Sequence, residues 1–86
     1  MNVAQGRLWV VATPIGNLDD LSPRAADVLR TVQLIAAEDT RHSALLLARV
    51  GSRAPCSALH EHNERDQVAH LLGRLQLGTD IALISD

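Results

Sequence analysis

The chain opens with an apolar run, Leu8-Trp9-Val10-Val11-Ala12, which leads into the turn-forming segment Thr13-Pro14-Ile15-Gly16-Asn17. Five consecutive apolar residues rich in strand formers are typical of a strand buried on both faces of a sheet. In the segment that follows, Pro14 fixes φ and Gly16 allows the backbone to approach a ligand. The pair of segments predicts the first strand of an α/β sheet, with a loop at its carboxyl end that can form part of a binding site.

The same order of helix and strand continues along the chain. Further strands are expected at 34–37, 56–59 and 81–84, where short apolar runs are bounded by polar or turn-forming residues. Three amphipathic helices are expected between the four strands. The expected N-caps are Ser22, either Asp39 or Thr40, and Asn63, and Gly51 and Gly78 are expected to end the second and third helices. The apolar face of the first helix is formed by Ala25, Val28, Leu29 and Val32, that of the second by Leu46, Leu47 and Val50, and that of the third by Val68, Leu71, Leu72 and Leu75.

Alternation of strands and helices with short loops favours right-handed crossovers and parallel strands. The fold class predicted is therefore α/β, a mainly parallel sheet of about four strands with three helices in layered βαβ units. The 86 residues allow one domain at most, and a chain this short buries only roughly 60–65% of its unfolded surface.

Composition narrows the classes of function. Apolar residues make up 47% and charged residues 21%, which is typical of a globular domain and not of a disordered tail or a membrane protein. The segment 1–7 has no signal-peptide pattern, so a cytosolic protein without membrane attachment is expected. With a net charge of −2 and Trp9 as the single aromatic residue, a freestanding nucleic-acid-binding module is disfavoured. A lone cysteine, Cys56, excludes an internal disulfide.

Polar residues collect where the predicted strands end, at 13–17, 38–42, 60–63 and 85–86. Carboxyl ends of parallel strands share one edge of a sheet, and open α/β sheets bind ligands in the crevice outside that edge. One binding site built from four loops is therefore predicted, although helix caps and loops are polar in any protein. Because the first loop holds a single glycine, neither a GxGxxG fingerprint nor a Walker A loop is present there.

Two of these loops carry titratable groups. Glu38-Asp39, followed by Arg41 and His42, either positions a hydroxyl or phosphate group, or is a helix cap with a weak pairing of Arg41 and Glu38. In extended chain, the segment His60-Glu61-His62 places both imidazoles on one face. They suit a pH-poised base or a substrate hydrogen bond, with solvated loop histidines as the alternative. A metal site is less favoured, because a third clear ligand is missing.

Two other classes of function stay open on these residues. One is a noncatalytic, receiver-like module with an acidic pocket formed by Asp19, Asp20 and the pair Glu38-Asp39, although such a domain also needs a lysine and the chain has none. The other is a metal-dependent hydrolase that uses His60, Glu61 and His62.

Four segments in register resemble a known family. They are Val11-Ala12-Thr13-Pro14-Ile15-Gly16-Asn17-Leu18-Asp19-Asp20, Ala37-Glu38-Asp39-Thr40-Arg41-His42-Ser43, His60-Glu61-His62-Asn63-Glu64 and Ala82-Leu83-Ile84-Ser85-Asp86. In this order they are similar to the start of members of the tetrapyrrole-methylase superfamily that modify ribosomal RNA.

The resemblance implies an enzyme that transfers a methyl group from S-adenosylmethionine to the ribose 2′-oxygen of a cytidine in the decoding region of 16S ribosomal RNA. It also implies a two-domain cytoplasmic homodimer, with the cofactor in the cleft between the domains. In the family, the strand that carries Ser85-Asp86 continues into an Ala-Gly-Thr-Pro loop. Residues 1–86 are therefore expected to be the N-terminal part of the cofactor domain, without the C-terminal domain and inactive alone.

Individual roles follow from the resemblance, position by position. No metal ligand is assigned. A base is expected at Glu61 or His62, which the resemblance does not distinguish. The expected contacts are Pro14, Ile15, Gly16 and Asp86 with the cofactor, and Arg41, His42 and Asn63, beside Glu61 and His62, with the substrate.

Overall fold

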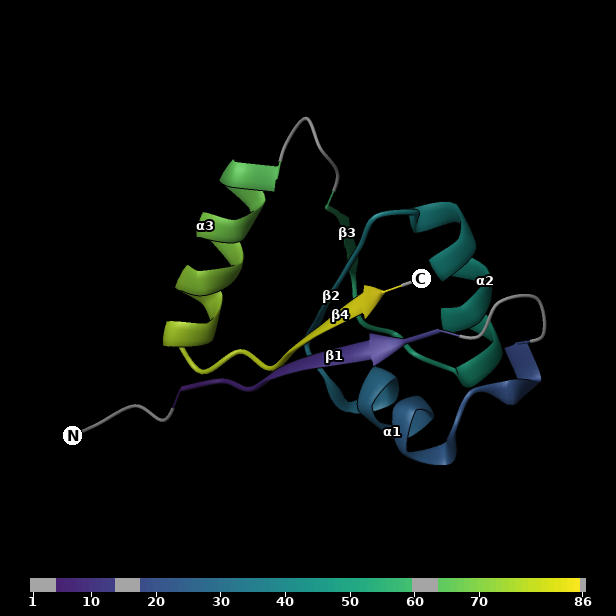
Figure 1. Cartoon of the computed structure of the whole chain (residues 1–86). Helices are drawn as coiled ribbons and strands as arrows, with labels where there is room; N and C mark the ends of the chain where they lie inside the picture. Colours follow the sequence, from purple (N-terminus) through teal and green to yellow (C-terminus); the bar gives the residue numbers. More distant parts are fainter. Residues whose placement is uncertain (1–4, 14–17, 60–63, 86) are drawn as a thin grey trace.

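The computed structural model describes residues 5–13, 18–59 and 64–85 of the chain (Figure 1). Its elements follow the predicted order, with one short 3-10 helix that the sequence pattern did not predict. They are β1 (Leu8–Ala12), η1 (Leu18–Asp20), α1 (Pro23–Thr31), β2 (Leu34–Ala37), α2 (Thr40–Val50), β3 (Cys56–Ala58), α3 (Glu64–Gln76) and β4 (Ile81–Ser85).

All four strands lie in one parallel sheet in the order β1-β4-β2-β3, which confirms the predicted α/β class. The last strand is inserted between the first two: Val10 is paired with Leu83 on one side of β4, and Ala36 with Leu83 on the other. The predicted third strand was one residue too long, because Leu59 lies beyond β3, although its N–H still donates to the Ala37 carbonyl at 2.7 Å. The fourth strand extends one residue further than predicted, to Ser85.

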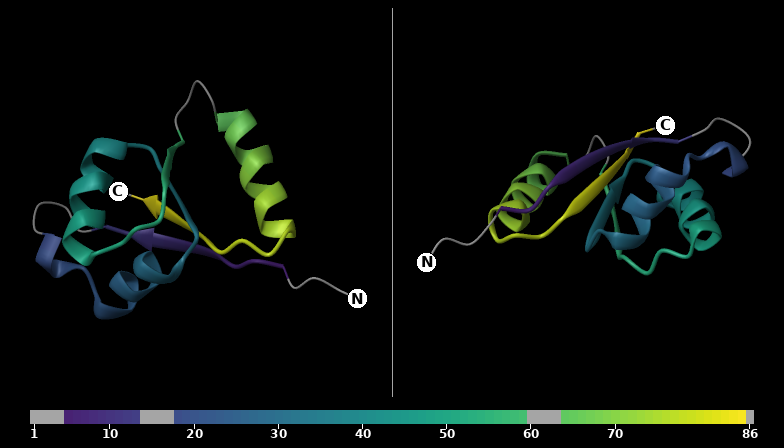
Figure 2. Two further views of the ribbon diagram at one scale, coloured as in Figure 1. Left: turned by 180° about the vertical axis from the view of Figure 1, so that it is seen from behind. Right: turned by 90° about the horizontal axis from the view of Figure 1, so that it is seen from below.

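The helices are divided unequally between the two faces of the sheet. Helices α1 and α2 lie together on one face, and α3 lies alone on the other (Figure 2). Right-handed crossovers explain this division. The chain moves in one direction across the sheet from β1 to β2 and from β2 to β3, and it returns from β3 to β4, so the last helix is placed on the opposite face.

Local signals set the helix ends. Ser22 Oγ accepts a hydrogen bond from the Ala25 N–H at 3.1 Å, as expected of an N-cap before Pro23. The carboxylate of Asp39 accepts from the N–H groups of Arg41 and His42, so Asp39 and not Thr40 is the cap of α2.

Glycines stop two helices, as predicted. Gly51 ends α2 with a φ of 78°, and Gly78 follows α3 with a φ of 93°. Both values lie in the left-handed region, which glycine adopts without the steric cost that a Cβ brings.

The larger core lies between the sheet and the pair α1 and α2. Leu29, Leu46 and Ile35 have no exposed surface, and Trp9 and Val28 pack against this cluster. Ser52 links the two helices, since its Oγ donates a 2.6 Å hydrogen bond to the carbonyl of Leu29. The predicted apolar faces of the first two helices pack on this core as expected, except that Val32, buried in the same cluster, follows α1 as its C-cap and is not part of the helix.

The apolar face predicted for the third helix is only partly buried. Leu71 and Leu75 pack on the sheet, but Val68 and Leu72 are 41% and 54% exposed. The prediction failed there because one helix does not cover this face of a four-stranded sheet. At the start of β1, Leu8 lines an apolar cavity of about 140 Å³ with Leu72 and Leu75 of α3, whereas Val10 further along the strand is 68% exposed.

The segment before β1 is fixed to the far end of α3. The N–H of Gly6 donates to the Leu75 carbonyl at 2.8 Å, and the N–H of Arg7 donates to the carboxylate of Asp80, also at 2.8 Å. A Cβ at Gly6 would lie 1.9 Å from the carbonyl oxygen of Thr79, so this close passage requires glycine. No helix among the described residues is long and apolar enough to cross a bilayer.

Candidate functional site

The carboxyl ends of all four strands lie at one edge of the sheet, as the sequence predicted. At this edge Thr13 is buried, and its N–H and Oγ1 both donate to the Ser85 carbonyl, at 2.9 and 3.4 Å. These bonds hold the end of β1 beside the end of β4. Thr13 and Ser85, the last described residues at these two strand ends, therefore lie next to each other.

A cavity of about 340 Å³ opens at the same edge. It lies at the point where the chain changes sides, because the connection after β2 turns to α2 on one face and the connection after β3 turns to α3 on the other. Open α/β sheets bind ligands at this kind of switch point. The cavity is lined by Glu38, Leu59, Glu64, Leu83, Ile84 and Ser85.

The chemistry of this lining favours one class of ligand. Among the described lining residues, Glu38 and Glu64 contribute carboxylates, and Leu59, Leu83 and Ile84 contribute apolar surface. Carboxylates accept hydrogen bonds from hydroxyl and ammonium groups and attract positive charge. These described residues therefore suit a ligand with a cationic or hydroxyl-bearing part and a flat apolar part.

The first turn of α2 lies at the same edge and carries basic side chains. Asp39 is used as the helix cap, Arg41 is exposed, and His42 is half-buried. The alternative pairing of Arg41 with Glu38 is not found, since the two ion pairs of the described residues are Arg30–Asp27 and Arg49–Asp19. Arg41 and His42 are thus placed where a substrate at the sheet edge can reach them.

Several predicted site residues lie outside the described residues. The structure places only their neighbours, Thr13, Leu59, Glu64 and Ser85, and all four are at the carboxyl edge. The predictions outside the described part concern Pro14, Ile15, Gly16, Glu61, His62, Asn63 and Asp86, together with His60 of the metal-hydrolase alternative.

Sequence reasoning missed most of the cavity lining. The sequence pattern predicted Leu59, Leu83 and Ile84 as strand residues only. They line the cavity because β4 lies next to β2, and no local sequence pattern indicates this pairing. Glu64 carried a usable signal, because it directly follows the predicted cap Asn63 at the start of a helix.

Other reactive groups do not form a second centre in the described part of the chain. No three side chains of His, Cys, Asp or Glu type gather there in a way that could hold a metal ion. Cys56 is half-buried, and burial raises the pKa of its thiol. The thiol therefore stays protonated at neutral pH, which makes it a poor nucleophile.

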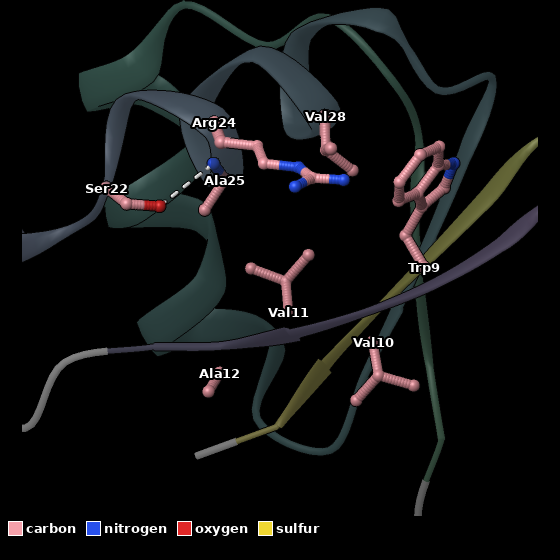
Figure 3. Close-up of a pocket in the computed structure, with 8 residues that line it drawn as sticks. All are labelled: Trp9, Val10, Val11, Ala12, Ser22, Arg24, Ala25 and Val28. Atoms are coloured by element: carbon pink, nitrogen blue, oxygen red, sulfur yellow. Dashed lines mark hydrogen bonds between the residues drawn. The ribbon is translucent and has the colours of Figure 1, made fainter.

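A second cavity of about 350 Å³ lies between β1 and α1 (Figure 3). Trp9 and Val11 extend from β1 toward Arg24 and Val28 of the helix, while Val10 points to the opposite side of the strand. This cavity is beside the outer strand β1, and its described lining includes neither Arg41 nor His42, the two predicted site residues that the structure describes.

Comparison with known proteins identifies the family. A family model described as Tetrapyrrole (Corrin/Porphyrin) Methylases matches residues 7–86. The chain belongs to the tetrapyrrole methylases. This result confirms the resemblance found in the four segments, and it favours a methylase over the receiver-like module and the metal hydrolase.

Three curated relatives are each named ribosomal RNA small subunit methyltransferase I. The chain is 60% identical to the Pseudomonas aeruginosa protein over 84 residues, which is 98% of this chain and 30% of that protein. It is 55% identical to the Escherichia coli O157:H7 protein over 83 residues, 96% of this chain and 29% of that protein. For the Pasteurella multocida protein the identity is 55% over 86 residues, 100% of this chain and 31% of that protein. The chain thus spans about 30% of the length of these relatives.

Proposed function

We propose that the chain is the N-terminal part of the cofactor domain of a methyltransferase, one that uses S-adenosylmethionine to methylate the ribose 2′-oxygen of a decoding-region cytidine in 16S ribosomal RNA. The observation that carries the proposal is the match of residues 7–86 to the methylase family, with relatives named for methylation of small-subunit ribosomal RNA. The longer enzyme acts in the cytoplasm on the small ribosomal subunit, as a homodimer.

The carboxylate-lined cavity supports the choice of cofactor. S-adenosylmethionine carries a positive sulfonium and a positive amino group, a ribose with two hydroxyl groups, and a flat adenine ring. Glu38 and Glu64 can accept hydrogen bonds from the ribose or balance positive charge, and Leu59, Leu83 and Ile84 offer apolar contact for a ring. In the proposal Pro14, Ile15, Gly16 and Asp86 contribute the remaining contacts, as the resemblance to the family implies.

When bound, S-adenosylmethionine supplies a methyl group on a sulfur atom that leaves as a neutral thioether. The residues of this chain have two tasks. Arg41, His42 and Asn63 hold the RNA so that the ribose 2′-oxygen lies in line behind the methyl group, and such positioning can account for much of a rate enhancement. Glu61 or His62 accepts the proton of the 2′-hydroxyl as the new O–C bond forms.

A chimeric enzyme tests the proposal directly. This chain replaces the matching 84 residues of the Pseudomonas aeruginosa relative, with which it is 60% identical. The chimera is produced in cells that lack their own copy of that enzyme, and 2′-O-methylation of 16S ribosomal RNA is measured by mass spectrometry of nuclease digests. We expect methylation at the cytidine modified by the intact relative. A folded chimera that leaves the RNA unmodified contradicts the proposal.

Two matched pairs of variants in the chimera test the residue roles. His62→Ala is compared with His70→Ala, which changes an exposed histidine in the middle of α3, and Arg41→Ala is compared with Arg53→Ala, which changes an exposed arginine before β3 at the opposite end of the strands. We expect the first member of each pair to lose at least 10-fold in turnover, in keeping with the effect of general-base and positioning groups, and the second to keep it. If His62→Ala and Arg41→Ala both keep wild-type turnover, the roles assigned to His62 and Arg41 are wrong.

Glu38→Gln tests the cavity as the cofactor site. The substitution keeps the shape of the side chain and removes its charge. Hydrogen bonds to charged groups contribute about 1.5–3 kcal/mol, so we expect S-adenosylmethionine to bind the chimera about 10-fold or more weakly in calorimetric titration. Asp27→Asn, a carboxylate exposed on α1, is the control. If the two variants bind S-adenosylmethionine with equal affinity, the cavity is not the cofactor site.

A further inference from the structure

Thr13 follows β1 directly, and it is only 8% exposed although its side chain is polar. Its N–H and its Oγ1 donate to the same acceptor, the carbonyl of Ser85, at 2.9 and 3.4 Å, across 72 positions of the sequence. A carbonyl oxygen has two lone pairs, so it can accept both bonds. Two bonds from one residue restrict the direction of the Ser85 carbonyl as well as its distance from β1.

The end of β4 depends on its contact with β1. The pairing of β4 with β2 ends at Ile84, which lies beside Ala37. The pairing with β1 continues one residue further, to Ser85 beside Ala12, and the bonds from Thr13 follow it (Figure 1). In the described pairing, the last residue of β4 is therefore held from the side of β1.

Ser85 also belongs to the carboxylate-lined cavity of about 340 Å³, whereas Thr13 is not among the described residues that line it. A change at Thr13 can thus reach the cavity through the Ser85 backbone. In the sequence, Thr13 and Ser85 directly precede Pro14 and Asp86, two of the residues proposed to contact S-adenosylmethionine.

We propose that Thr13 is a positioning residue for the methyl donor. Its hydroxyl fixes the Ser85 carbonyl, and with it the wall of the carboxylate-lined cavity where β1 and β4 end. Thr13 does not touch the reacting atoms and acts through Ser85. This inference rests on the proposed function, because the cavity it concerns is the one proposed for S-adenosylmethionine.

The choice of threonine at this position supports the role. The backbone bond to Ser85 is available to any residue other than proline, but the second bond requires a hydroxyl group. The branched Cβ of threonine restricts χ1, so the hydroxyl is held in few directions. Valine has a similar branched shape without the hydroxyl. In Thr13→Val the Ser85 carbonyl keeps its bond to the N–H of residue 13, so we expect the fold to tolerate the change.

Thr13→Val in the chimera with the Pseudomonas aeruginosa relative tests the role. Calorimetric titration with S-adenosylmethionine gives the dissociation constant, and initial rates on small ribosomal subunits at saturating S-adenosylmethionine give kcat. We expect the dissociation constant to rise about 5-fold, the effect of losing one neutral hydrogen bond. We expect kcat to change less than about 2-fold, because lost binding common to the ground state and the transition state leaves kcat unchanged.

Two further variants are the controls. Thr13→Ser keeps the hydroxyl and should bind S-adenosylmethionine like the unsubstituted chimera. Thr31→Val is the matched substitution elsewhere, because Thr31 Oγ1 also donates to a backbone carbonyl, that of Asp27 at 2.9 Å. Thr31 ends α1, shortly before the amino end of β2, so its variant should keep the affinity for S-adenosylmethionine.

Hydrogen exchange in the absence of S-adenosylmethionine separates positioning from general stability. In Thr13→Val the amide of residue 13 should exchange at least about 3-fold faster, after correction for the intrinsic rate of valine, because its acceptor is less restricted. The amides of Ile35 and Ile81, which donate to the carbonyls of Pro55 and Arg7, should keep their protection. In Thr13→Ser all three amides should exchange as in the unsubstituted chimera.

Three results overturn the role of Thr13. The first is a Thr13→Val chimera that binds S-adenosylmethionine as tightly as the unsubstituted one. The second is a Thr13→Ser chimera that binds it as weakly as Thr13→Val, because the hydroxyl is then not the group that matters. The third is faster exchange at Ile35 and Ile81 as well as at residue 13, which would indicate a general loss of stability.

Failure of the proposed function gives a different result. An unsubstituted chimera that binds no S-adenosylmethionine contradicts the proposed function and the role of Thr13 together. In a chimera that binds S-adenosylmethionine and methylates the RNA, each of the three results above overturns the role of Thr13 and leaves the proposed function intact.

Discussion

The two faces of the sheet differ in how completely they are covered. On the face of α1 and α2, Leu29, Ile35 and Leu46 are entirely buried, and two helices linked by Ser52 close the core. On the other face, α3 alone packs over the sheet, and Leu72 and Val10 remain more than half exposed. Apolar residues are abundant on both faces, so composition does not cause the difference. The difference arises because two crossover helices pack on one face of the sheet and one crossover helix packs on the other.

This difference predicts that the two faces contribute unequally to stability. A closed core stabilises a domain because its side chains lose water contact only on folding. An exposed apolar strand edge can still lose water contact on association. We therefore expect a substitution on the closed face to change the free energy of unfolding more than the same substitution on the open face.

Leu46→Ala should have the largest effect. Leu46 has no exposed surface, and removal of a buried leucine side chain costs about 2–5 kcal/mol, much of it through the cavity that remains. Leu72→Ala, the same change on α3 at a position that is 54% exposed, should cost less than about 1 kcal/mol. Chemical denaturation of the two variants under monomeric conditions measures both. Equal losses would mean that the open face is as well packed as the closed one.

Gly6→Ala should come next and concerns the open face. The new Cβ would lie 1.9 Å from the carbonyl oxygen of Thr79, which is backbone and cannot rotate away. The chain must shift, and overpacking of this kind costs about 1–3 kcal/mol. The shift should also break the hydrogen bond from the Gly6 N–H to Leu75, visible as faster hydrogen exchange at Gly6. Gly73→Ala, on α3 with no atom near the new Cβ, is the control and should be neutral or stabilising. A stable Gly6→Ala variant would show that the segment before β1 is not fixed to α3.

Ser52→Ala should have a moderate effect on the closed face. It removes the 2.6 Å hydrogen bond to the Leu29 carbonyl and leaves that oxygen with one partner fewer, for a loss of about 1 kcal/mol. Thermal unfolding followed by circular dichroism is sufficient to detect it. No change in stability would mean that packing alone holds α1 and α2 together.

Asp19→Asn should have the smallest effect. The ion pair of Asp19 with Arg49 joins η1 to α2, but both side chains are more than half exposed, and exposed pairs contribute about 0–1 kcal/mol. We expect less than about 0.5 kcal/mol, reduced further in 0.5 M salt because mobile ions screen the pair. A larger, salt-resistant loss in the same denaturation experiment would show that η1 is an essential part of the closed face.

Sequence-based prediction succeeded where the signal is local. Ser22 and Asp39 cap helices through bonds to residues two or three positions away, and Gly51 ends a helix through its own φ. The parallel sheet and the meeting of the strand ends at one edge follow from the alternation of strands and helices. The catalytic and cofactor residues expected at Glu61, His62 and Pro14 stay predictions, since they lie outside the described residues.

The amino-acid sequence by itself determined which segments form strands and helices, where the helices start and stop, and, through the motifs, the family. Those properties depend on neighbours within a few positions or on residue identity alone. Only the tertiary structure decided that β4 lies between β1 and β2, that Leu83 and Ile84 line the cavity with Glu38, and that β1 is an outer edge. These depend on contacts between residues about 50 or more positions apart, and local propensity does not encode the order in which strands come together.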